Sequence, residues 1–179
     1  MKPLSLTLKN FGPYINETID FTKFEDSSLF LISGKTGSGK TTIFDGMSYA
    51  LFGESSGKLR LGKEMRSTFA DPSEATEVTL LFKHNEYLYE LNRLPEQELF
   101  KKRGTGVRKQ SAKISLIVKD AQGKELRAYS KRREVDELIQ ELLHLNANQF
   151  AQIVLLPQGE FRTFLIAKSD EKEKVLRNL

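Results

Sequence analysis

The feature that most constrains this chain is a glycine-rich stretch at residues 34–41, which reads Gly-Lys-Thr-Gly-Ser-Gly-Lys-Thr. It matches the phosphate-binding pattern G-x-x-x-x-G-K-[ST]. The apolar run at 29–32 predicts a buried strand before the loop. Residues 42–52 have apolar side chains at helical spacing, and Gly53 is placed to end that helix. A strand, a glycine loop and a helix in this order favour a nucleotide phosphate site over an ordinary flexible turn.

The residue types in this loop suit a nucleoside triphosphate. Gly34, Gly37 and Gly39 allow the backbone to bend so that successive N–H groups point inward, and the helix that follows adds the positive end of its dipole. We expect Lys40 to reach the β- and γ-phosphates as a catalytic residue, and the Thr41 hydroxyl to bind Mg²⁺. The predicted nucleotide-binding residues of the loop are Gly34, Lys35, Thr36, Gly37, Ser38, Gly39, Lys40, Thr41 and Thr42.

Composition narrows the class of protein further. A chain of 179 residues makes one domain or slightly more, with enough length to bury a core. The net charge of +4 permits a polyanionic partner without requiring one. The absence of cysteine excludes disulfides and thiolate metal sites. Because the sequence has no long apolar segment and no signal-peptide pattern at its start, we expect a cytoplasmic protein with no membrane partner.

The rest of the chain predicts a mixed α/β fold, in which the phosphate-loop strand and helix join an antiparallel meander. Alternating apolar residues indicate strands, and apolar residues at helical spacing indicate an amphipathic helix that begins near residue 131. The expected strands are 4–8, 17–21, 77–82, 87–93, 113–119 and 124–128. Residues 54–63 are expected to form a surface connection. The segment 169–179 has a helix start at Ser169 but no stop signal, so we expect the natural polypeptide to continue.

A nucleotide hydrolase of this kind also needs an acidic residue at the end of an apolar strand, to hold Mg²⁺. The nearest candidate is Asp120, after the run 116–119, but it begins a plausible hairpin turn and we interpret it as a turn residue. The sequence therefore predicts a nucleotide-binding loop without its catalytic acid.

Three motifs together resemble one known family. They are the opening segment 8–13, the helix segment 43–53 after the phosphate loop, and the segment 156–161. In this order and spacing they resemble the N-terminal lobe of the SbcC family, the ATPase subunits of bacterial SbcCD nucleases, which are related to SMC proteins and ABC ATPases. The resemblance spans the whole chain and implies an α/β P-loop fold. Residues 1–168 would form the N-terminal lobe of an ABC-type ATPase head, and 169–179 would begin a coiled-coil helix.

The resemblance accounts for the missing acid, because the ATPase head of this family is split. A C-terminal lobe supplies the acidic strand, the signature motif and the switch histidine. The family binds ATP and Mg²⁺, and Gln158 would be the Q-loop glutamine that approaches the metal and the attacking water. Asn10 and Arg66 resemble residues near the nucleotide, although Arg66 could equally be a solvated surface arginine or lie near DNA.

The resemblance also implies partners and a role. These are the chain's own C-terminal lobe, a second head that joins in an ATP-dependent dimer, the SbcD nuclease and double-stranded DNA. Together they would control DNA access to the nuclease during the processing of DNA ends and hairpins. Gly46 is a departure, since the family commonly has Ala there. In mid-helix it should cost about 1 kcal/mol of helix propensity.

A basic segment at 101–113 contains six cations and no acid. Phosphate backbones attract such a loop without sequence preference, so it is a candidate DNA contact, and the alternative is a solvated hairpin tip. The predicted nucleic-acid-binding residues are Lys101, Lys102, Arg103, Arg108 and Lys109. His84 and His144 have no partners at metal-ligand spacing, so we interpret them as surface or helix-face residues.

Two other functions remain open from the residues. A P-loop nucleotide or small-molecule kinase would share the phosphate loop but would need an arginine-bearing lid and an acceptor pocket. A nucleotide-gated, non-catalytic DNA tether would share both the loop and the basic segment. The sequence downstream of Leu179 would separate these from a split ATPase head.

Overall fold

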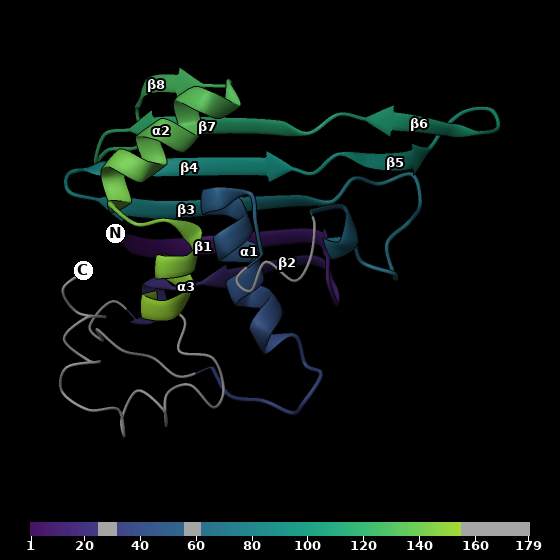
Figure 1. The fold of residues 1–179 in the computed structure, drawn as a ribbon, viewed down its shortest axis with the longest axis horizontal. Helices are drawn as coiled ribbons and strands as arrows, with labels where there is room; N and C mark the ends of the chain where they lie inside the picture. Colours follow the sequence, from purple (N-terminus) through teal and green to yellow (C-terminus); the bar gives the residue numbers. More distant parts are fainter. Residues whose placement is uncertain (25–31, 56–61, 155–179) are drawn as a thin grey trace.

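The fold was obtained as a computed structural model, which describes residues 1–24, 32–55 and 62–154 (Figure 1). The strands are β1 (Lys2–Phe11), β2 (Tyr14–Asp20), β3 (Glu77–His84), β4 (Tyr87–Leu94), β5 (Gln97–Phe100), β6 (Val107–Gln110), β7 (Lys113–Lys119) and β8 (Glu125–Tyr129). The helices are α1 (Lys40–Phe52), α2 (Arg132–Leu143) and α3 (Ala147–Val154), with short 3₁₀ turns η1 (Thr22–Phe24) and η2 (Gly62–Met65).

Six strands form one antiparallel sheet in the order β2-β1-β3-β4-β7-β8. Its register places four leucines in one continuous row, because Leu6 lies opposite Leu80, Leu80 opposite Leu91, and Leu91 opposite Leu116. All four side chains are buried. Since side chains alternate between the two faces of a strand, this row fixes which face of each strand turns toward the core.

The helices cover that apolar face (Figure 1). Helix α1 packs against β1, β3 and β4, and α2 packs against β7. The core therefore lies between the leucine row and the buried sides of α1 and α2, where Met47, Leu51, Val135 and Ile139 are buried. The opposite face carries polar cross-strand pairs, such as the hydroxyls of Thr7 and Thr18 at 2.9 Å. One apolar face and one polar face are typical of an antiparallel sheet that is covered on one side.

Strands β5 and β6 form a separate two-stranded sheet that extends beyond the six-stranded sheet (Figure 1). We call residues 97–110 the arm. Its strands were not among those predicted from the sequence. Their register pairs Gln97 with Gln110 and Phe100 with Val107. Residues 101–106, which begin with three cations, therefore form the loop at the end of the arm.

Most of the predicted elements are confirmed. The hairpins β3–β4 and β7–β8 lie where the alternation indicated, and α1 ends at Gly53, whose N–H donates to the Tyr49 carbonyl at 2.8 Å. The predicted surface connection after α1 was wrong at Ser55, which is buried. The strand expected at 29–32 lies outside the described residues except for Ile32, which is in no regular element. The segments 156–161 and 169–179 also lie outside them.

Candidate nucleotide-binding site

The phosphate loop leads directly into α1. Gly37 and Gly39 have φ of 84° and 88°, the left-handed region that glycine enters without steric cost. Gly39 is the N-cap of α1 and provides no side-chain cap, so the first backbone N–H groups of the helix are left without side-chain acceptors. Together with the helix dipole, these donors make the start of α1 suited to binding an anion.

Lys40 already lies over this loop. Its ammonium donates to the carbonyl of Gly34 at 2.6 Å and to that of Lys35 at 2.8 Å. An ammonium has three donors, so these two bonds leave one for a phosphate oxygen. The loop thus orients the lysine before any ligand is bound.

Thr41 and Thr42 differ in exposure, although both were predicted to bind ligand. Thr41 is exposed on the first turn of α1, where its hydroxyl is accessible to a metal ion. Thr42 is buried beside the turn between β1 and β2, and a Cβ atom added to Gly12 would come within 2.5 Å of its Cγ2 atom. Gly12 is therefore needed for this close approach. Ligand binding by either threonine stays a prediction.

The turn between β1 and β2 covers the last glycine of the loop, a feature that was not predicted from the sequence. The Tyr14 hydroxyl donates to the Gly39 carbonyl at 3.2 Å. A Cβ atom added to Gly39 would lie 2.8 Å from Pro13 and 2.7 Å from the Tyr14 hydroxyl oxygen. Burial, with a smaller effect from Glu17, raises the pKa of Tyr14, so the hydroxyl remains a donor at neutral pH. The only sequence signal was that Gly12-Pro13 precedes an aromatic residue.

The far end of α1 is held by a buried arginine that was also not predicted. Arg93 on β4 is 5% exposed, and its guanidinium donates to the carbonyls of Ala50 at 2.6 Å and Leu51 at 3.1 Å. It also forms an ion pair with Asp136 of α2 at 2.6 Å. In the sheet register Arg93 lies opposite Val78, a buried residue of the apolar face, in the first pair of the β3–β4 ladder. A cation at the C-terminal end of a helix is favoured by the helix dipole.

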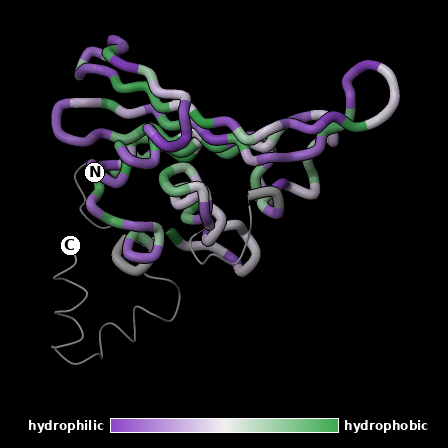
Figure 2. The backbone as a smooth tube through the Cα atoms, turned by 45° about the horizontal axis from the view of Figure 1, so that its top comes forward, coloured by the Kyte–Doolittle hydropathy of each residue, from purple (hydrophilic) through white to green (hydrophobic). Residues whose placement is uncertain are grey.

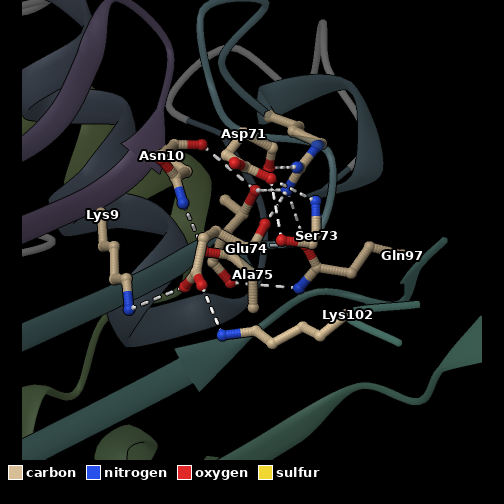
Figure 3. Close-up of polar contacts among 10 residues, drawn as sticks. Lys9, Asn10, Asp71, Ser73, Glu74, Ala75, Gln97 and Lys102 are labelled. Atoms are coloured by element: carbon tan, nitrogen blue, oxygen red, sulfur yellow. Dashed lines mark hydrogen bonds and ion pairs between the residues drawn. The ribbon is translucent and has the colours of Figure 1, made fainter. Parts of the chain in front are cut away.

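Asn10 and Arg66 belong to one polar cluster at the end of β1, which also includes the loop 71–76 and Gln97 at the start of the arm (Figure 3). Asn10 is buried, has a φ of 50°, and donates to the Ala75 carbonyl at 2.9 Å. Arg66 donates to the carbonyls of Glu74 at 2.7 Å and Asp71 at 2.8 Å. Burial lowers the pKa of Arg66, against the opposing effect of Asp71. Both side chains therefore brace the loop 71–76.

The remaining residues that the sequence singled out are Asp120, the cations of the basic segment and Gln158. Asp120 accepts backbone N–H groups from Gln122 at 3.0 Å and Lys124 at 2.9 Å, which confirms that it is a turn residue. The five predicted DNA-contacting cations are on the arm, and Gln158 lies outside the described residues.

Neither a cluster of metal-binding side chains nor a membrane-spanning helix occurs in the described ranges. Within residues 1–24, 32–55 and 62–154, no group of three or more His, Cys, Asp or Glu side chains could hold a metal ion. In the same ranges, no helix is both long and apolar enough to cross a membrane. The described part of the chain therefore has a phosphate loop but no carboxylate cluster beside it.

Comparison with known proteins identifies one matching family model and a set of similar SbcC proteins. The sequence model of the AAA domain family matches residues 5–179. SbcC proteins of the SbcCD nuclease from several bacteria are similar along the whole chain. The one from Lactococcus lactis is 46% identical over 183 residues, that from Vibrio cholerae 44% over 180, and that from Staphylococcus aureus strain JH9 47% over 179. The chain spans only 17 to 18% of the length of these relatives.

A solved structure from work on ATP-driven dimerization and DNA-stimulated activation of SMC ATPases also matches, over 99% of each chain. Its TM-score is 0.47 and its sequence identity 17%. The resemblance to SbcC that the three sequence motifs indicated is confirmed by the curated relatives. The chain belongs to the AAA domain family, and its described residues form an α/β fold in which a phosphate loop leads into α1, consistent with a P-loop ATPase lobe.

Proposed function

We propose that this chain is the ATP-binding lobe of a split, SbcC-like ATPase head. The observation that carries the proposal is the pre-oriented Lys40, held over the glycine loop by two carbonyls at the start of α1. The identity of 44 to 47% to SbcC proteins supports the same assignment. ATP, when bound, supplies the phosphoanhydride bond that the complete head would hydrolyse.

The donors at the loop fit a triphosphate with Mg²⁺. Backbone N–H groups and Lys40 would bind the phosphate oxygens, and the exposed Thr41 hydroxyl would be a metal ligand. Mg²⁺ takes many of its ligands from phosphates and water, so a site with one hydroxyl is sufficient for binding. Hydrolysis needs more. We infer that a C-terminal lobe supplies the acid, and that Gln158 positions water at the metal.

The same proposal extends to partners. A second SbcC head would close over the nucleotide, and the SbcD nuclease and double-stranded DNA would bind the assembled heads. The identity of 44 to 47% to SbcC proteins along the whole chain favours this arrangement over a kinase that works alone.

The proposal can be tested with the 179-residue chain and calorimetric titration of ATP in the presence of Mg²⁺. Lys40→Ala should weaken binding by about tenfold or more, because a charge-assisted contact to phosphate contributes roughly 1.5–3 kcal/mol. Lys124→Ala, in the exposed turn before β8, is the matched control and should bind as the wild type does. Steady ATP turnover by the chain alone, abolished in Lys40→Ala, would contradict the split head and favour the kinase.

A further inference from the structure

The arm carries a concentration of positive charge. Residues 97–110 include five cations and one acid, Glu98. Two cations are paired with acids outside the arm, Lys102 with Glu74 at 2.6 Å and Lys109 with Glu96 at 3.0 Å. Within the described residues, Lys101 and Arg103 at the end of the arm form no ion pair. The end of the arm therefore presents uncompensated charge to a polyanion.

The backbone keeps this charged loop compact. The Lys101 N–H donates to the Gly106 carbonyl at 3.0 Å, which closes the loop above the last strand pair. Gly104 and Gly106 have φ of 78° and 104°, conformations that other residues rarely adopt. In Figure 2 the loop is hydrophilic on one side and near neutral on the other, and the arm beside it is coloured as hydrophobic.

That hydrophobic part is an exposed apolar pair. Phe100 and Val107 lie directly opposite each other as the last pair before the loop. Side chains alternate along β5, so that Gln97 and Leu99 are buried toward the body while Phe100 points away from it. Phe100 is 56% exposed and Val107 48% exposed. An aromatic residue is thus held on a short ribbon next to Lys101 with more than half of its surface exposed.

We propose that the arm is a site for nucleic acid with unpaired bases, in which the Phe100 ring stacks on a base and Lys101 and Arg103 contact the flanking phosphates. The charge complementarity of the arm selects a polyanion, and the exposed ring adds a stacking surface that every base can use. A base inside a duplex is already stacked on both sides, whereas one in a single-stranded extension offers a free face. This inference rests on the proposed function. It adds a preference for unpaired bases, which the positive charge of the arm alone does not give.

The test uses the full-length protein that carries this lobe, without divalent metal, and fluorescence anisotropy with two probes. One probe is a blunt DNA duplex, and the other is the same duplex with a short single-stranded thymine extension. Phe100→Ala should weaken binding of the extended probe by about fivefold or more, and binding of the blunt probe by less than about twofold. Its plot of log affinity against log salt should keep the wild-type slope, because the ring carries no charge.

Three further variants separate the contributions. Phe100→Tyr retains a ring and should keep the preference for the extended probe. Tyr87→Ala removes another exposed aromatic side chain, 45% exposed on β4 beside the β3–β4 turn, and should behave as the wild type does. Replacing Lys101 and Arg103 with Ala should flatten the salt plot for both probes, by up to about 0.9 per lost duplex contact.

Equal loss on both probes, or no loss on the extended probe, would overturn the stacking role of Phe100. A Phe100→Ala effect confined to binding of a protein partner would also overturn it and would identify the arm as a protein interface. ATP binding measured in the same variants keeps this outcome separate from the proposed function. If Phe100→Ala shows no selective loss on the extended probe while ATP binding is normal, only the inference about the arm is refuted.

Discussion

Replacing Arg93 should destabilise the fold more than replacing any exposed arginine, because Arg93 satisfies the buried C-terminal end of α1. Arg93→Met keeps a long apolar stem but removes the guanidinium. The carbonyls of Ala50 and Leu51 would then lose their donors. Each unsatisfied buried acceptor costs about 1–3 kcal/mol, and the lost cation at the helix end costs about 0.3–1 kcal/mol more.

The ion pair with Asp136 adds less to this sum, because the Asp136 side chain is 37% exposed and remains solvated when its partner is lost. The expected decrease in the free energy of unfolding is about 3–5 kcal/mol, within the range spanned by the two unsatisfied acceptors and the lost cation together. For a domain of this size, that corresponds to a decrease in Tm of roughly 6–20 °C.

Equilibrium urea unfolding monitored by circular dichroism measures this change, and the chain offers a matched control. Arg132 contacts the same Asp136 carboxylate at 3.3 Å, but its side chain is 75% exposed. Arg132→Met should cost less than about 0.5 kcal/mol. Arg93→Lys keeps the charge with one ammonium and should fall between the two. If Arg93→Met and Arg132→Met were equally mild, the capping role of Arg93 would be refuted.

Two more predictions concern the core and the sheet end. Gly46→Ala should fail to gain the roughly 1 kcal/mol expected from helix propensity, because the new Cβ atom would lie 2.6 Å from the buried Leu8 side chain. The double variant Gly46→Ala, Leu8→Val should recover stability, as measured by urea unfolding. A gain in stability in the single variant would contradict the packing argument. The pKa of His84 is lowered, chiefly by burial, and its Nδ1 atom has no partner within the described residues. A lowered pKa means that the folded state binds fewer protons, so stability should decrease as pH falls below about 6.5. His84→Gln should flatten this dependence in thermal unfolding between about pH 7 and 5. Parallel curves for His84→Gln and wild type would contradict the assignment.

The sequence predicted those elements whose signals are local. The alternation of Leu4, Leu6 and Leu8 identifies β1, and Gly53 marks the end of α1. The phosphate loop was recognisable because its function requires glycine at fixed positions. The arm strands were missed because β5 buries the polar Gln97 and exposes the apolar Phe100, so its alternating burial does not appear as an alternation of apolar and polar residues.

The contacts that hold the site could not be predicted in the same way, because they join residues far apart in sequence. Arg93 lies 43 residues from Ala50, and nothing in the pattern of β4 indicates that its charge faces the core. Tyr14 lies 25 residues from Gly39. Gly46 illustrates the reverse case: its helix cost is readable from sequence, but its reason is the Leu8 side chain packed against it.

Arg66 could bind a nucleotide or DNA phosphate only in competition with the hydrogen bonds that it already makes in this fold. Its guanidinium donates four hydrogen bonds, to the Glu74 and Asp71 carbonyls and, at 3.3 Å each, to the side chains of Thr76 and Gln97. Hydrogen bonds to a charged group contribute about 1.5–3 kcal/mol when short, and less at the longer distances. A bidentate contact with phosphate through both Nη groups would take the two short bonds from the Glu74 and Asp71 carbonyls and leave the loop 71–76 without its brace. It would offset that loss, because it replaces two charge-assisted bonds with two stronger ones. Contact between a phosphate and both Nη groups of Arg66 therefore implies that the loop 71–76 rearranges at the same time.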